Sequence, residues 1–266
     1  MVVEFIKNNI GFYLLTALIG LLLAGLVFFL LWRKRQTPGA QSFLLFVSAV
    51  AGVFAGGHAM FFIVSLPEFI RDFVPNIHSM DDLFSAIAYC ASGMVFYGGL
   101  LGALLFAYLY CRANHMDLRA NLNHAIVVFP LFHCFGRIGC AFTGCCYGIE
   151  YYGPLAIKYT SDYIIHGKND DIADFTRFPV QPLEALAELI IFVILLVIYL
   201  KTEDRYPLTP IYLLTYSVVR FTDEFLRGDA IRGIWGPFST SQWISLAILA
   251  VTVIYLIVKR KHLKRV

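Results

Sequence analysis

An arginine, two glycines and several cysteines stand together where a long apolar segment of the chain ends. Residues 133–148 contain four of the six cysteines, and Arg137 lies between Gly136 and Gly139. A cation in such a segment costs about 2.5–3.5 kcal/mol on membrane-insertion scales, so its side chain is expected to face a partner or a polar cavity. Because a planar guanidinium can hold two phosphate oxygens, Arg137 is a candidate for binding a lipid phosphate. The alternative is an arginine that snorkels to the interface or pairs with a carboxylate.

A second set of charged residues falls on one face of a predicted helix. Such a stripe in an otherwise apolar helix must face protein or water rather than lipid. Arg220 and Glu224 could form a purely structural ion pair, which would leave Arg227 for a ligand or a headgroup. Together with Arg137, this face predicts a site for an anionic phospholipid or a phosphorylated lipid carrier. The residues follow the spacing i, i+4, i+7, i+8 and i+11: Tyr216, Arg220, Asp223, Glu224 and Arg227.

Polar residues also recur at helical spacing at the start of the preceding apolar segment. Gln181, Glu184 and Glu188 are expected near the same end of the molecule as the arginines. Carboxylates in an apolar helix need partners, and the arginines could supply them, so the expected role is to orient the arginines. His133 could act as a general base, or it could be a histidine that is only hydrogen-bonded near a helix end.

The four clustered cysteines leave three interpretations open. With His133 they contain enough ligands for a zinc or iron site, although their spacing lacks the paired C-x-x-C form. They could instead form a disulfide or a redox-active thiol. In the third interpretation they are small side chains packed around a glycine-rich turn. The cysteines are Cys134, Cys140, Cys145 and Cys146.

Composition predicts an integral membrane protein. The chain has 266 residues, of which 59% are hydrophobic and 15% charged, and its mean hydropathy is +0.71. Soluble proteins average about 25% charged residues. The long apolar runs predict an all-α polytopic fold, because they do not read as the short alternating strands of a membrane barrel. About seven transmembrane helices are expected, near residues 10–32, 41–66, 85–110, 124–142, 182–200, 207–226 and 239–258.

The order of spans and basic residues predicts the topology. No repeat or linker divides the sequence, so a single membrane domain over residues 1–266 is expected, with an external loop at 143–181. The first span ends in a basic run and lacks a cleavage pattern, so it is expected to remain as an anchor. The positive-inside rule places the basic loops and tail in the cytoplasm and the N-terminus outside. A net charge of +3 does not favour nucleic-acid binding.

Glycines interrupt the second and third expected spans. Gly56 and Gly57 precede His58, and Gly98 and Gly99 follow Tyr97. These glycines could let helices pack closely, or they could bend a helix around a cavity. In the external loop, residues 153–159 predict a short strand or hairpin.

Several motifs, in order along the chain, resemble those of the bacterial prolipoprotein diacylglyceryl transferase family. Residues 97–102 read Tyr-Gly-Gly-Leu-Leu-Gly and are similar to the family's His-Gly-Gly-Leu-Ile-Gly segment. Residues 136–140 resemble its Gly-Arg signature, and residues 179–184, Pro-Val-Gln-Pro-Leu-Glu, resemble its Pro-Thr-Gln-Leu-Tyr-Glu segment. Residues 220–227 are similar to its arginine-rich stretch, and residues 239–242 to its Ser-x-x-Gln start of the last span.

The resemblance implies transfer of a diacylglyceryl group from phosphatidylglycerol to the cysteine thiol of a lipoprotein precursor. Glycerol phosphate would leave, and the reaction would occur at the outer half of the bacterial cytoplasmic membrane without a cofactor. The implied catalytic residues are Arg137 and Arg220, which would neutralise the phosphate, and Tyr97. The implied substrate-binding residues are Gly98, Gly99, Gln181, Glu184, Tyr216, Glu224 and Arg227.

Two segments of the chain depart from the family pattern. Tyr97 stands where the family has a histidine, and residues 140–146 replace a half-signature that contains asparagine and glutamate. The step that activates the acceptor thiol is therefore open. Two alternative functions remain: a membrane thiol-redox or metal-binding protein that uses the cysteines, and a phospholipid-binding scaffold without catalysis.

Overall fold

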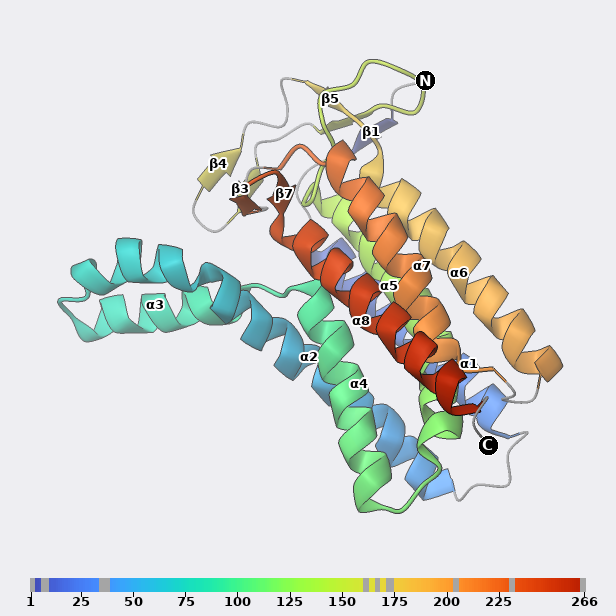
Figure 1. Cartoon of the computed structure of the whole chain (residues 1–266). Coiled ribbons are helices and arrows are strands. Elements are labelled where there is room, and N and C mark those ends of the chain that lie inside the picture. Colours follow the sequence, from blue (N-terminus) through green and yellow to red (C-terminus); the bar gives the residue numbers. More distant parts are fainter. Residues whose placement is uncertain are drawn as a thin grey trace. The chain divides into compact units, whose positions relative to one another are not determined.

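The computed structural model of the chain is mostly helical (Figure 1). It describes residues 3–5, 10–33, 39–159, 163–165, 168–170, 175–202, 206–229 and 233–263. Six helices of this described part are long and apolar enough to cross a membrane, which confirms the all-α polytopic fold class. They are α1 (Ile10–Trp32), α2 (Gly39–Glu68), α4 (Phe96–Ala113), α5 (Leu118–Thr143), α6 (Val180–Thr202) and α8 (Thr240–Leu263).

Exposed apolar side chains along these helices agree with a lipid environment. On α1, leucines four residues apart form one stripe, from Leu14 at 63% exposed to Leu22 at 64% and Leu26 at 55%. In water such a stripe would be an unfavourable contiguous apolar surface, whereas acyl chains solvate it well. The chain is therefore a multi-pass membrane protein.

Two of the seven expected spans differ from the structure. The span expected at 85–110 consists of α3 (Met80–Ser92) and α4, separated by extended backbone at Gly93 and Val95. The span expected at 207–226 is α7 (Leu208–Asp223), which has 16 residues and continues as the 3-10 turn η3 (Glu224–Leu226). At a rise of 1.5 Å per residue α7 is about 24 Å long, shorter than the roughly 30 Å of hydrocarbon.

The chain divides into two compact units, residues 1–33 with 126–266 and residues 34–125. In the first unit α6, α7 and α8 lie side by side (Figure 1). Helix α1 packs on α5 through glycines: a Cβ atom on Gly20 would lie 2.6 Å from the Cβ of Phe135, and one on Gly139 would lie 2.5 Å from Thr16 Oγ1. The prediction of a single domain over the whole chain stays a prediction.

Short strands cover one end of the first unit's helices. β2 (Ile157–Tyr159) pairs in parallel with β1 (Val3–Phe5) and antiparallel with β5 (Thr176–Arg177). Tyr147, Ile157 and Tyr159 form a small buried cluster within this region. The strand predicted within residues 153–159 is thus confirmed as β2. Two hairpins complete the strands: β3 (Tyr163–Ile165) with β4 (Lys168–Asp170), and β6 (Ile234–Trp235) with β7 (Phe238–Ser239).

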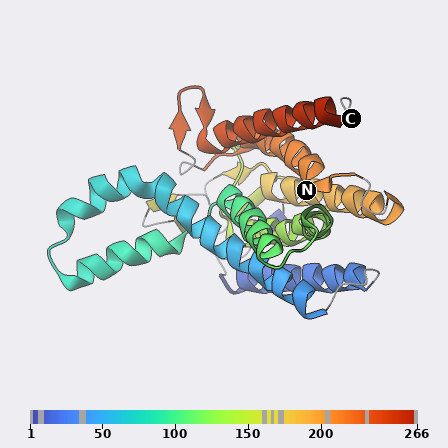
Figure 2. The same ribbon diagram turned by 60° about the horizontal axis from the view of Figure 1, so that its bottom comes forward.

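The second unit is built on close packing between α2 and α4 (Figure 2). A Cβ atom on Gly98 would lie 2.3 Å from Gly56 O, and one on Gly102 would lie 2.1 Å from Gly52 O. These glycines therefore let the two backbones touch, which supports the packing interpretation of the glycine pattern. Helix α2 ends beyond Pro67 in a π-turn, η1 (Phe69–Phe73), and a 3-10 turn, η2 (Val74–Asn76), which lead to α3.

Candidate active site

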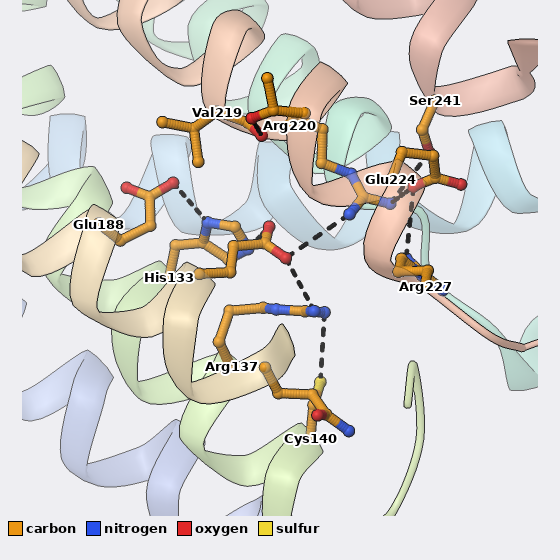
Figure 3. Close-up of polar contacts among 12 residues, drawn as sticks. His133, Arg137, Cys140, Glu188, Val219, Arg220, Glu224, Arg227 and Ser241 are labelled. Carbon is orange, nitrogen blue, oxygen red and sulfur yellow. Dashed lines mark hydrogen bonds and ion pairs between the residues drawn. The ribbon is translucent and has the colours of Figure 1, made fainter. Parts of the chain in front are cut away.

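Glu184 of α6 lies at the centre of a buried set of charges. Arg137 Nη2 from α5 lies 2.7 Å from Glu184 Oε2, and Arg220 Nη1 from α7 lies 3.5 Å from the same oxygen. The other carboxylate oxygen, Oε1, accepts a hydrogen bond from Tyr216 at 3.1 Å. The side chain of Glu184 is only 1% exposed, and both arginines are buried. One carboxylate thus holds two guanidinium groups from different helices together (Figure 3).

A second carboxylate links Arg220 to Arg227. Arg220 Nη2 lies 2.7 Å from Glu224 Oε2, and Arg227 Nη1 lies 3.9 Å from it (Figure 3). Arg227 also donates to both carboxylate oxygens of Asp229, at 2.8 and 2.5 Å. Asp229 thus already holds the guanidinium of Arg227 bidentately, and the expectation that Arg227 binds a ligand or a headgroup stays a prediction.

The start of α8 fixes Arg220 from another side. Ser241 Oγ accepts a hydrogen bond from Arg220 Nη2 at 3.2 Å. The preceding turn is a capping box, in which Ser239 N donates to Gln242 Oε1 at 2.9 Å and Gln242 N donates to Ser239 Oγ at 3.3 Å. The Ser-x-x-Gln motif thus has a local structural role, and its helix end places Ser241 against the arginine.

His133 and Glu188 form a second layer behind Glu184. His133 Nδ1 lies 2.8 Å from Glu188 Oε1, and its Nε2 lies 3.9 Å from Glu184 Oε1. Tyr212, stacked on Tyr216 at a centroid distance of 5.7 Å, donates to Glu188 at 3.3 Å. The hydrogen-bonded interpretation of His133 is therefore supported. The residue lies inside α5, which continues for ten residues beyond it to Thr143.

Gln181 faces the cysteine-rich turn. Its Nε2 donates to the carbonyl oxygen of Cys145 at 2.9 Å and to the hydroxyl of Tyr159 at 3.1 Å. The side chain is fully buried, so these bonds replace hydration that burial removes. Gln181 thus ties the start of α6 to the turn that follows α5.

Residues 147–150 join the same turn to the end of α7. Ile149 N donates to Leu226 O at 2.9 Å, Gly228 N donates to Tyr147 O at 2.9 Å, and Phe178 N donates to Ile149 O at 2.8 Å. A Cβ atom on Gly148 would lie 2.2 Å from Phe178 O, so this position requires glycine. The arrangement brings Arg227 beside the cysteine-rich turn.

Three cysteines gather at this turn. The sulfur atoms of Cys140, Cys145 and Cys146 all lie within 4.8 Å of one another. Arg137 Nη1 lies 3.9 Å from Cys140 Sγ (Figure 3). Hydrogen bonds from the neighbouring thiols, together with the charges of Arg227 and Arg137, lower the pKa of the Cys146 thiol well below its usual range. Cys134 and His133, the other ligands considered for a metal, are not part of this group.

The remaining predicted residues belong to the second unit. Tyr97 is buried at 2% exposure at the start of α4, with its ring centroid 6.1 Å from that of Phe96. Gly98 packs against α2, and a Cβ atom on Gly99 would lie 3.3 Å from Val53. The catalytic role of Tyr97 and the substrate contacts of Gly98 and Gly99 therefore stay predictions.

Sequence reasoning missed several contributors to the site. Tyr212 lies one helical turn before Tyr216, so the same face analysis could have found it. Tyr159 had no such signal, because 21 residues separate it from Gln181 in the sequence. Ser241 could be placed only by knowing that α8 begins beside α7.

Comparison with known proteins matches this chain to one family. A family model described as prolipoprotein diacylglyceryl transferase matches residues 1–258. The phosphatidylglycerol–prolipoprotein diacylglyceryl transferase of Clostridium tetani is 29% identical over 80% of this chain and 79% of its own length. A second such enzyme, from Clostridium perfringens, is 29% identical over 83% of this chain and 81% of its own length. One from Helicobacter pylori is 33% identical over 65% of this chain and 60% of its own length.

Proposed function

Because the chain belongs to the prolipoprotein diacylglyceryl transferase family, we propose that its buried arginine–glutamate cluster is the site of diacylglyceryl transfer. The arginine–glutamate cluster comprises Arg137, Glu184, Arg220, Glu224 and Arg227. The chain is a transferase and a multi-pass bacterial membrane protein. The donor is phosphatidylglycerol and the acceptor is the cysteine thiol of a prolipoprotein. The observation that carries the assignment to this site is the single carboxylate oxygen that holds guanidinium groups from two helices.

Arg137 and Arg220 bind the phosphate of the donor lipid. Arg137 Nε has no hydrogen-bond acceptor among the described residues, and Arg220 Nη1 makes only its ion pair with Glu184. These buried donors suit an incoming phosphate, which offers several acceptor oxygens. As the carbon–oxygen bond breaks, negative charge grows on the leaving glycerol phosphate, and two fixed guanidinium groups stabilise that charge.

Glu184 keeps the two arginines close together before the lipid arrives. Two guanidinium groups that contact the same carboxylate oxygen lie close enough to repel each other. The buried negative charge of Glu184 compensates for that repulsion. Tyr216 fixes the carboxylate by donating to its second oxygen. The cost of orienting the charges is therefore met during folding and not at the moment of reaction.

The acceptor thiol must reach the site as a thiolate, since the thiolate is the nucleophilic form. Its sulfur forms a bond to the terminal glyceryl carbon of the diacylglyceryl group. The bond from that carbon to the phosphate oxygen breaks, and its electron pair leaves with glycerol phosphate. The thiol proton is released, and the products are a thioether and glycerol phosphate.

We further propose that the site faces the outer half of the cytoplasmic membrane. Basic residues lie at the opposite ends of the first unit's helices, with Arg33 after α1 and Lys201 in the last turn of α6. Under the positive-inside rule these ends are cytoplasmic. The N-terminus is then outside, and the C-terminus is in the cytoplasm.

The function is tested with a lipobox peptide, which is a peptide that carries the acceptor cysteine of a prolipoprotein. The peptide is incubated with the purified chain and phosphatidylglycerol and is then analysed by mass spectrometry. The expected product is a peptide whose cysteine carries a diacylglyceryl mass. Arg137→Ala is expected to lower the rate of product formation by about 10²–10³-fold, whereas Arg112→Ala, which changes an exposed arginine of α4, is expected to retain the wild-type rate. Phospholipid bound without any product would favour a non-catalytic scaffold, and identical product with Arg137→Ala would place the reaction elsewhere.

A further inference from the structure

The tricysteine cluster of Cys140, Cys145 and Cys146 has no role in the phosphate chemistry above. The three sulfur atoms lie within 4.8 Å of one another, and each residue is partly exposed. All three thiols are free, so no disulfide accounts for their proximity. The cluster adjoins the phosphate-binding arginines, because Arg137 Nη1 lies 3.9 Å from Cys140 Sγ.

The backbone of the turn is bent to bring these thiols together. Gly144 has φ of 77° and Cys146 has φ of 55°, both in the left-handed region. A residue other than glycine rarely adopts that region, and such a backbone conformation persists where the surrounding structure enforces it. The turn thereby folds Cys145 and Cys146 back onto the last turn of α5, where Cys140 lies. Simple packing around a glycine-rich turn would not require a cysteine at the left-handed position.

The sulfur geometry matches the ligand set of a zinc ion. With zinc–sulfur bonds of about 2.3 Å in tetrahedral geometry, ligand sulfur atoms lie about 3.8 Å apart. The three cysteine sulfur atoms lie within 4.8 Å of one another, so no separation exceeds this spacing by more than about 1 Å. Three protein ligands with a fourth open position are typical of catalytic zinc, whereas structural zinc has four protein ligands.

Polar side chains fix the cysteines in place, as residues that hydrogen-bond to metal ligands do in metal sites. Thr143 Oγ1 lies 3.3 Å from Cys145 Sγ, and Gln181 Nε2 donates to the carbonyl oxygen of Cys145 at 2.9 Å. Arg137 adds a positive charge beside Cys140. Three thiolates and one zinc ion carry a net charge of −1, which this guanidinium partly neutralises.

We propose that the tricysteine cluster binds one zinc ion whose open fourth position takes the thiol of the acceptor cysteine. This inference rests on the proposed function, and it supplies the acceptor-activation step that the residues at the arginine–glutamate cluster do not. On coordination the thiol gives up its proton to solvent, because a thiol that binds zinc is deprotonated. Its sulfur then forms the bond to the glyceryl carbon while Arg137 holds the leaving phosphate nearby. Zinc undergoes no redox change, and none is needed in this transfer.

Metal content of the whole chain tests the binding site. Protein purified in detergent under reducing conditions, without chelator, is expected to contain one zinc per chain by elemental mass spectrometry. Cys145→Ser and Cys146→Ser are expected to lose it, whereas Cys111→Ser, on α4, is expected to keep it. Zinc-free wild-type protein that also fails to take up added zinc or cobalt would overturn the proposal, and so would full zinc retention in both serine variants.

The open position is tested with cobalt in place of zinc. Thiolate-to-cobalt charge-transfer absorption is expected to increase when a lipobox peptide is added, as the number of sulfur ligands rises from three to four. A peptide with serine in place of its cysteine is expected to leave the spectrum unchanged. No increase with the cysteine peptide would overturn the proposed activation of the acceptor thiol.

These measurements separate the zinc site from the proposed function. Metal content and the cobalt spectrum are read without any lipid donor, so they stand even if no diacylglyceryl transfer occurs. If zinc is bound and removal by a chelator leaves the transfer rate unchanged, thiol activation by zinc is overturned while the transferase function stands. A loss of at least 10-fold on chelation, restored by added zinc, is the expected result.

Discussion

Glu184 is the residue on which the charges of the candidate site depend. Its Oε2 atom lies 2.7 Å from Arg137 and 3.5 Å from Arg220, and the carboxylate is almost fully buried. Removing one member of a buried ion pair is costly, because the charges left behind are neither hydrated nor compensated. The same residue therefore controls both the stability of the helix bundle and the position of the phosphate-binding groups.

Replacing Glu184 with glutamine is expected to lower the free energy of unfolding by about 3–5 kcal/mol. The amide keeps the size of the side chain but leaves Arg137 and Arg220 to repel each other. Thermal unfolding in detergent measures the effect, with Glu150→Gln, an exposed glutamate, as the matched control. In the double variant with Arg137→Gln the two losses are expected to be less than additive, and full additivity would contradict the shared ion pair.

In the second unit, the hydroxyl of Tyr97 is the group whose removal is expected to affect the transfer rate. If it takes part in proton transfer, Tyr97→Phe should reduce the rate of transfer by about 10²–10⁴-fold while binding of phosphatidylglycerol is retained. Rate and lipid binding are measured on the same purified variant. An unchanged rate would show that Tyr97 is a buried packing residue at the start of α4.

Helix contacts set by glycine dominate at the scale of elements. The α2–α4 contact depends on backbone approach at Gly56, Gly98 and Gly102, where added Cβ atoms would lie within 2.3 Å of a carbonyl oxygen. Sequence reasoning recognised this glycine pattern and the helical faces of residues 181–188 and 216–227, because both follow from helical periodicity. It did not recognise that α7 has only 16 residues or that the third span breaks at Gly93, because average hydropathy is insensitive to helix ends.

Gly98→Ala is expected to destabilise the chain by about 1–3 kcal/mol, because the new methyl group must push α2 and α4 apart. Gly136→Ala provides the matched control within a helix, since a Cβ atom there meets nothing within 4 Å. That variant is expected to gain about 0.5–1 kcal/mol from the higher helix propensity of alanine. Thermal unfolding compares the two, and equal effects would contradict the close α2–α4 packing.

At the scale of the whole molecule, the chain combines lipid-facing apolar helices with a buried polar site. Composition was sufficient to predict the membrane class, and the order of motifs was sufficient to predict the family. The contacts of the site were only partly predictable, because Glu184 joins three helices and Gln181 binds a turn and a strand that are separated from it in the sequence. Asp229 shows the same limit, since only the structure reveals that it holds Arg227.

The proposed topology predicts opposite locations for two reporter tags. A tag inserted in the hairpin beside Lys168 is expected outside the cytoplasmic membrane, and a tag after the last residue is expected in the cytoplasm. Protease or reporter-enzyme accessibility in intact cells distinguishes the two sides. Detection of both tags on one side would contradict the proposed orientation.

The most direct test of the central claim is the rate of diacylglyceryl transfer in Arg137→Ala, Arg220→Ala and the double variant. Each single change removes one guanidinium from the leaving phosphate and is expected to lower kcat by about 10²–10³-fold. Because both arginines act on one phosphate, the double variant is expected to lose less than the product of the two single effects. Folded single variants that retain the wild-type rate would contradict the account, since the reaction would then not depend on the arginine–glutamate cluster.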